Sequence, residues 1–72
     1  MNQLNPRKLL DSKWTALVPT DRQKHFVVVK VAFDEAGLVV VECVIEAVLT
    51  RQRRHIDWRE LRDPAHWRFG WQ

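Results

Sequence analysis

A chain of 72 residues with a formal net charge of +3 has room for one domain, and its core can only be small. The single cysteine, Cys43, excludes an internal disulfide, so four tryptophans and three phenylalanines are the groups available to stabilise that core. The apolar stretches are too short and too charged to cross a bilayer, and the first ten residues contain no apolar run of signal-peptide length. We therefore expect one cytoplasmic domain over residues 1–72, without a membrane partner.

Charge is distributed unevenly along the chain. Residues 1–33 carry six basic and two acidic side chains, and residues 34–50 carry four acidic side chains and no basic one. Residues 51–72 carry six arginines and three acids. Such basic ends are compatible with binding to nucleic acid or to an acidic partner.

The N-terminal third predicts one helical turn and one strand. Asn5 is suited to cap a helix and Pro6 to occupy its first position, which predicts a short turn over residues 4–10. Apolar and other side chains alternate over residues 12–18, with Trp14 on the apolar side, and this alternation favours a strand. Residues 19–23 form the loop that follows.

The middle of the chain predicts a long β-hairpin with strands over residues 24–34 and 38–49. Valine is abundant in both segments and suits a pleated surface, which makes a helix over 38–49 the poorer choice. Gly37 ends a three-residue loop that begins at Glu35, and a left-handed glycine is common at that position.

This loop predicts a register in which paired residue numbers add up to 72. One face of the hairpin then pairs apolar residues and forms the core: Phe33–Val39, Val31–Val41, Val29–Cys43 and Val27–Ile45, with His25–Ala47 as the exception at the end of the ladder. On the second face Lys30 lies opposite Glu42. That face also holds four large apolar residues which need a cover: Phe26, Val28, Val44 and Val48.

The C-terminal third predicts a short strand and two helical turns. The strand covers residues 54–58, and Asp57 with Glu60 forms a capping box at the start of a helix over 58–62. Asp63 and Pro64 stop this helix and begin a second turn over 64–67. We expect Trp67 to be buried on the second face of the hairpin and Trp71 to be the ring available to a ligand.

Together these elements predict a β-rich α+β fold. The expected architecture is a three- to four-stranded antiparallel sheet around the hairpin 24–34/38–49, with short N- and C-terminal helical turns. A long strand over 38–49 tends to bend, so a small SH3-like barrel is the alternative.

The chain resembles a family of short tryptophan-rich bacterial proteins that is grouped as a domain of unknown function. Five segments carry the resemblance: "NPRKLLDSKWTA" at 5–16, "KHF" at 24–26, "EAVLT" at 46–50, "WRELRD" at 58–63 and "WRFGW" at 67–71. The resemblance implies no established activity, cofactor or active site.

The residues themselves do not predict catalysis or metal binding. Cys43, His25, His55 and His66 lack the short spacings of structural zinc sites, and we expect Cys43 to be a buried, inert thiol and His25 to cap the edge of the core. Glu42 and Glu46 share a strand face but lie about 13 Å apart, which is too far for a catalytic pair of carboxylates. The only two glycines cannot make a phosphate-binding loop. We therefore expect a protein that is not an enzyme and has no cofactor.

Binding is the function that the sequence favours. The first hypothesis is a protein-interaction module that docks on a protein partner or on a second copy of itself. The alternative is RNA or other nucleic-acid binding, with an arginine cluster on the phosphates and an exposed aromatic ring stacked on a base. Its candidate residues are Arg51, Arg53, Arg54, Arg59, Arg62 and Trp71. The simplest interpretation of "RQRR" at 51–54 is a solvated hairpin turn.

Overall fold

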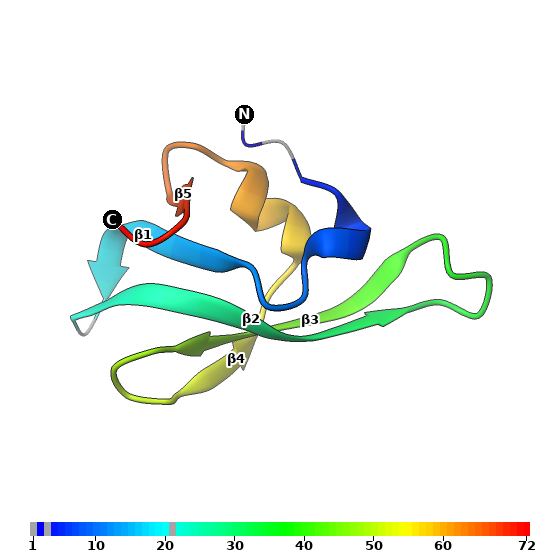
Figure 1. Ribbon diagram of the computed structural model, residues 1–72, viewed down its shortest axis with the longest axis horizontal. Helices are drawn as coiled ribbons and strands as arrows, with labels where there is room; N and C mark the ends of the chain where they lie inside the picture. The colour runs from blue at the N-terminus through cyan, green and yellow to red at the C-terminus, as the bar shows by residue number, and fades with distance from the viewer. Residues whose placement is uncertain (1, 3, 21) are drawn as a thin grey trace.

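The computed structural model describes residues 2, 4–20 and 22–72 of the chain. The described residues form one antiparallel sheet with the strand order β4-β3-β2-β1-β5, together with two 3-10 helices (Figure 1). The elements are η1 (Pro6–Lys8), β1 (Lys13–Thr20), β2 (Gln23–Phe33), β3 (Val40–Ala47), β4 (Arg53–His55), η2 (Trp58–Arg62) and β5 (Trp67–Phe69).

The fold is all-β, so the α+β prediction is wrong in two respects. Two of the three predicted helical turns are 3-10 helices of three and five residues. The third, predicted over 64–67, is a turn over 64–66 that leads into β5, and no α-helix occurs among the described residues. No helix in this part of the chain is long and apolar enough to span a membrane. The sheet contains five strands and is open, because β4 and β5 lie at its two edges and do not pair with each other. The SH3-like barrel is therefore excluded.

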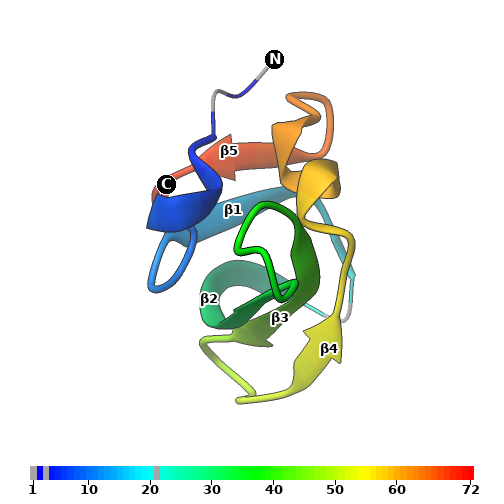
Figure 2. The same cartoon turned by 90° about the vertical axis from the view of Figure 1, so that its right-hand side faces the viewer.

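One face of the curved sheet packs against the core, and the other carries mainly polar side chains. Both 3-10 helices lie over the same side, which we call the inner face (Figure 2). Its core contains Leu9, Trp14, Ala16, Phe26, Val28, Cys43, Ile45, Ala47, Leu61 and Trp67. The opposite side, which we call the outer face, presents Lys13, Thr15, His25, Val27, Lys30, Glu42, Val44, Glu46, Arg53, His55 and Arg68.

The predicted turn of the long hairpin is confirmed, but its register is wrong. Gly37 has a φ of 70°, the left-handed conformation that the loop requires. Two irregularities then shift the pairing, the first between Val28 and Lys30 and the second between Ala32 and Phe33. Val31 therefore lies opposite Cys43, and Val28 lies opposite Ile45.

The bulge near Val29 reverses which residues of β2 face the core. A bulge adds one residue to a strand, so the residues that face the core have even numbers before it and odd numbers after it. Phe26 and Val28 are buried on the inner face, whereas Val27 and His25 belong to the outer face. Val27, Val28 and Val29 are consecutive, so an apolar residue is available to either face at this point and the sequence pattern does not reveal the bulge.

The same shifts expose residues that the predicted register placed in the core. Val39 and Val41 are 56% and 63% exposed, and β3 begins at Val40 instead of residue 38. The Lys30–Glu42 ion pair does form, with 3.1 Å between Nζ and Oε1, although these residues are diagonal neighbours across the strands and not directly opposed.

The predicted helix caps are confirmed. The Asn5 side chain accepts a hydrogen bond from the Arg7 backbone N–H at the start of η1. At the start of η2, Asp57 and Glu60 form the complete capping box. The buried side chain of Leu61 attaches η2 to the core. Local side-chain chemistry therefore fixes where these two turns begin.

The C-terminal segment forms a strand that the sequence did not predict. Trp67 to Phe69 pair with Ala16 to Trp14 and place β5 at the edge of the sheet beside β1. Trp67 is only 6% exposed and its ring packs edge-on against Phe26, with ring centroids 5.4 Å apart. The predicted burial of Trp67 against Phe26 is confirmed, whereas Val44 lies on the outer face and Val48 stays partly exposed in a turn.

Candidate binding surfaces

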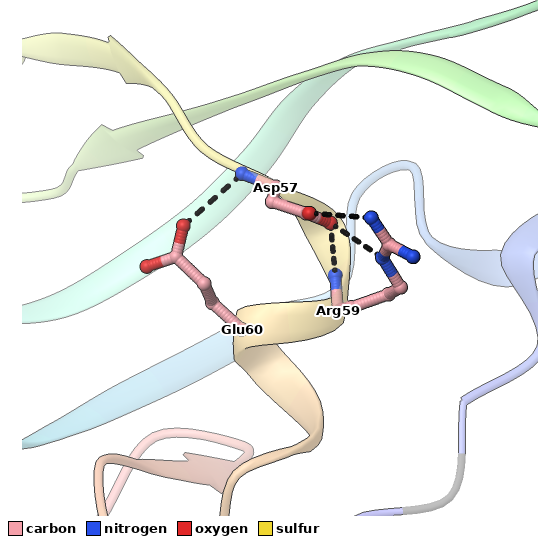
Figure 3. A network of polar contacts seen from close by, with 3 residues as sticks. All are labelled: Asp57, Arg59 and Glu60. Atoms are coloured by element: carbon pink, nitrogen blue, oxygen red, sulfur yellow. Dashed lines mark hydrogen bonds and ion pairs between the residues drawn. The ribbon is translucent and has the colours of Figure 1, made fainter.

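Arg59 is held by the cap of η2. Its Nε and Nη2 atoms donate to the Asp57 carboxylate at 3.1 and 2.8 Å, while the Arg59 backbone N–H donates to the same carboxylate (Figure 3). Glu60 completes the arrangement by accepting from the Asp57 backbone N–H. These contacts lower the pKa of Asp57 and raise that of Arg59. The guanidinium group of Arg59 is thus committed to stabilising a turn.

Arg51 and Arg53 meet at Glu46 on the outer face. Arg53 Nε lies 2.8 Å from Glu46 Oε1, and Arg51 Nη1 lies 3.8 Å from Glu46 Oε2. Glu46 is buried beneath the two arginines, whereas the Arg51 side chain is 81% exposed. One buried carboxylate therefore orders two cations that remain open to solvent.

Arg54 lies on the other side of the sheet. It is opposite Ile45, so its side chain projects on the inner face, where its guanidinium carbon lies 5.8 Å from the centre of the Phe26 ring. Arg62 is half-buried on η2 and lines a shallow surface with Arg59 and Asp63. The five candidate arginines are therefore divided between the two sides of the sheet, with only Arg51 and Arg53 on the outer face.

Trp71 also belongs to the outer face and is 45% exposed. Its indole N–H donates to the Phe26 carbonyl at 3.0 Å. Lys13 Nζ lies over the Trp71 ring, 5.3 Å from its centre, and the centroid of the His25 ring is 5.9 Å away. Thr15 fixes the neighbouring backbone, because its hydroxyl donates to the Gly70 carbonyl and accepts from the Gln72 N–H. The ring is held against the sheet while much of it stays accessible.

Sequence reasoning missed three of the cations on the outer face. Lys13 and Arg68 come from β1 and β5, and Lys30 comes from β2. They share the outer face because of the strand register, which places Lys13 opposite Val27 and Arg68 opposite Thr15. The position of Lys13 could have been predicted from the sequence. Successive side chains of a strand point to opposite faces, so a buried Trp14 places Lys13 on the other face.

The second candidate surface lies along β3 near the hairpin turn, on the edge that points away from β2. We call this the outer edge of β3, and it is distinct from the outer face of the sheet. Leu38 is 77% exposed, and together with Val39 and Val41 it forms an apolar patch at the tip of the hairpin. A groove of about 490 Å³ runs beside this edge and is lined by Pro6, Leu38, Val39, Val40, Val41, Glu42, Cys43, Ile56, Asp57, Trp58 and Arg59. Clustered aliphatic side chains on a small protein are typical of an interaction site.

A second pocket of about 570 Å³ opens at the other end of the inner face. Buried Phe26 and Trp67 lie at its base, and Arg54 and His66 stand at its wall with Asp63. The Asp63 carboxylate lies 2.7 Å from His66 Nδ1 and also accepts from the Ala65 N–H. The polar groups at this wall are therefore largely paired with one another.

Cys43 and the histidines lie in separate environments. Cys43 is buried in the core, and its burial raises the pKa of the thiol to about 11, with a smaller contribution from the Asp57 charge. His25 donates from Nε2 to the Gln72 carbonyl, His55 pairs with Glu42 and His66 pairs with Asp63. Among the described residues, no group of three or more His, Cys, Asp or Glu side chains is arranged to hold a metal ion.

Comparison with protein families identifies the chain. Residues 12–72 match the family model described as Tryptophan-rich protein (DUF2389), so the chain belongs to this family of unknown function. The match leaves out residues 5–11, which were part of the resemblance noted in the sequence. Neither the curated proteins nor the solved structures contain a match.

Proposed function

We propose that this member of the tryptophan-rich DUF2389 family is a protein-interaction module that pairs with a second copy of itself through the outer edge of β3. The observation that carries this proposal is the exposure of Leu38, Val39 and Val41 directly beside an uncovered sheet edge. Solvent contact of these aliphatic groups is unfavourable, and burying them in an interface would remove it.

The uncovered edge has defined limits. β4 pairs with β3 only from Val44 to Glu46, and the Ile56 N–H donates to the Cys43 carbonyl immediately before that stretch. Between the hairpin turn and Cys43, none of the described residues pairs with β3 on this side. Backbone N–H and C=O groups on such an edge are available to an added strand.

A second copy fits an edge of this length. Antiparallel pairing centred on Val40 places Val39 opposite the partner's Val41, so the two exposed valines of this edge are covered by those of the other copy. In this register the paired segment runs from residue 38 to residue 42 of each copy. The part of β3 that β4 covers, from Val44 onward, lies opposite the partner's hairpin turn and not opposite its β3. The arrangement has two-fold symmetry, in which the same patch serves both copies.

Charge and shape also favour this occupant. In the proposed register Glu42 lies opposite the partner's Leu38, so the two Glu42 carboxylates lie at opposite ends of the paired segment. Lys30 already forms an ion pair with Glu42 within each copy, and the hydrogen bonds from Lys30 and His55 lower the pKa of this carboxylate. The groove beside Ile56 and Trp58 offers apolar surface to the side chain of the partner's Leu38.

The interface is small, which predicts weak association. Stable complexes bury about 1,200–2,000 Å² in total, and one short strand pair with a few aliphatic contacts is below that range. We therefore expect a dimer with a Kd between about 10 μM and 1 mM.

Sedimentation equilibrium over that concentration range tests the proposal. The wild type should show a monomer–dimer equilibrium, and the double variant Val39→Gln/Val41→Gln should be monomeric throughout. The double variant Val18→Gln/Leu49→Gln is the matched control, because it also removes two exposed aliphatic side chains but lies away from the β3 edge. A wild type that is monomeric at about 1 mM refutes the proposal, as does an equal loss of dimer in the control.

A further inference from the structure

We infer that the outer face of the sheet is a binding surface for single-stranded nucleic acid, with Trp71 as the stacking ring. This surface is distinct from the β3 edge and differs from the arginine cluster that the sequence suggested. It retains Arg51, Arg53 and Trp71 from that set and adds Lys13, Lys30 and Arg68.

The outer face carries a net positive side-chain charge. Its five cationic side chains and two carboxylates give 5 − 2 = +3, which equals the formal charge of the whole sequence, 12 − 9 = +3. The cations are Lys13, Lys30, Arg51, Arg53 and Arg68, and the carboxylates are Glu42 and Glu46. The other seven basic and seven acidic residues cancel. A polyanion is therefore attracted to the outer face in preference to the rest of the molecule.

The carboxylates on this face lie beneath the cations. Glu46 is buried, and the guanidinium groups of Arg51 and Arg53 extend past it into solvent. Glu42 is likewise less exposed than the Lys30 side chain that pairs with it. An approaching phosphate therefore meets the positive groups first, and Arg51 and Arg53 are already ordered by their shared partner.

Trp71 supplies the feature that selects single strands. Its indole N–H is anchored to the Phe26 carbonyl, and the Thr15 hydroxyl fixes the backbone on both sides of the ring. Lys13 lies within 5.3 Å of the ring centre and Arg68 projects from the same face. An aromatic ring beside cations binds a base and its flanking phosphates together, whereas a duplex hides its base faces.

Outer-face binding does not require the edge pairing proposed above, because the Val39→Gln/Val41→Gln variant leaves every outer-face charge in place. Loss of dimerisation in that variant with retained oligonucleotide binding separates the two surfaces. Each proposal can therefore fail without the other.

Fluorescence anisotropy with a labelled single-stranded homopolymer, oligo-U or oligo-dT, tests the inference. The wild type should bind at low salt, and the logarithm of its association constant should fall linearly with the logarithm of salt concentration. Each lost phosphate contact changes that slope by about 0.7 for a single strand, so Lys13→Glu/Arg68→Glu should reduce it by about 1.4. Trp71→Ala should weaken binding by about fivefold to a hundredfold.

The double variant Lys8→Glu/Arg54→Glu is the matched control. It makes the same change in net charge, but Lys8 belongs to η1 and Arg54 projects on the inner face. We expect it to weaken binding much less than Lys13→Glu/Arg68→Glu does. If the two double variants lose affinity equally, the assignment to the outer face is overturned. Circular dichroism of each variant verifies that the proteins compared are folded. Absence of oligonucleotide binding by the wild type at low salt, or unchanged affinity in Trp71→Ala, overturns the inference as well.

Discussion

Replacement of Trp67 by alanine should remove most of the stability of the domain. A fully buried tryptophan removes about 150–250 Å² from water, which corresponds to about 4–6 kcal/mol at 25 cal/mol per Å². The edge-on contact with Phe26 adds about 1 kcal/mol, and large-to-small core substitutions of this type cost about 3–5 kcal/mol in practice. A domain of this length has a free energy of unfolding of about 4–11 kcal/mol, so Trp67→Ala should remove a large part of it and should unfold the domain if the wild type lies at the lower end of that range.

Trp71→Ala provides the matched comparison, because both residues are tryptophans of the same C-terminal segment. Trp71 is half-exposed and donates one hydrogen bond to the Phe26 carbonyl, so its loss should cost about 1–3 kcal/mol, less than the loss of Trp67. Urea unfolding followed by far-ultraviolet circular dichroism measures both values, and Trp67→Phe gives a graded intermediate if Trp67→Ala does not fold. Equal destabilisation by Trp67→Ala and Trp71→Ala would refute the assignment of Trp67 to the core.

Three further predictions concern a thiol, the carboxylates and a turn. Cys43 should react with a thiol reagent at pH 8 at least about a hundredfold more slowly in the folded protein than in urea, because burial raises its pKa from 9.0 to about 11. Stability should decline as the pH falls below the ordinary carboxyl pKa values of 4.5 for Glu and 3.8 for Asp, because the unfolded state then binds protons before the folded state does. Folding lowers the pKa of four carboxylates: Asp34, Glu42, Asp57 and Asp63. Acid titration followed by circular dichroism measures this decline. Gly37→Ala should cost about 1 kcal/mol in urea unfolding, because φ is 70° there, and an unchanged midpoint would contradict the left-handed turn.

Local chemistry was enough to predict the turns of this fold. The Asp57–Glu60 capping box, the Asn5 cap and the left-handed Gly37 each depend on residues within a few positions of one another, and all three are confirmed. Such signals can be recognised in a sequence because the interacting groups are neighbours along the chain.

The strand pairing could not be predicted in the same way. A bulge near Val29 shifts the strand pairing by one residue. Because residues 27–29 are all valines, either choice of inward-facing residues gives an apolar face, and the sequence does not distinguish them. The strand β5 was missed because it covers only three residues and is defined by its pairing with β1, more than fifty positions earlier. Both features are set by contacts distant in sequence.

Only part of the candidate site could be predicted from the sequence, because its residues come from strands that are distant along the chain. Arg53 and Arg54 are consecutive in a strand, so their side chains necessarily point to opposite faces, and the apparent arginine cluster had to divide. The grouping of Lys13, Arg68 and Trp71 requires β1 and β5 to pair and the last residues to fold onto the outer face. Only the fold brings these residues together.

The pairing of two copies through β3 can be observed directly by isotope-filtered nuclear Overhauser spectroscopy. In a mixture of ¹³C-labelled and unlabelled protein at about 1 mM, we predict contacts between the methyl groups of Val39 in one copy and the partner's Val41. Dilution should weaken these contacts together with the dimer. Absence of intermolecular contacts at that concentration, or contacts that involve Val18 and Leu49 in place of the β3 edge, would contradict the proposed interface.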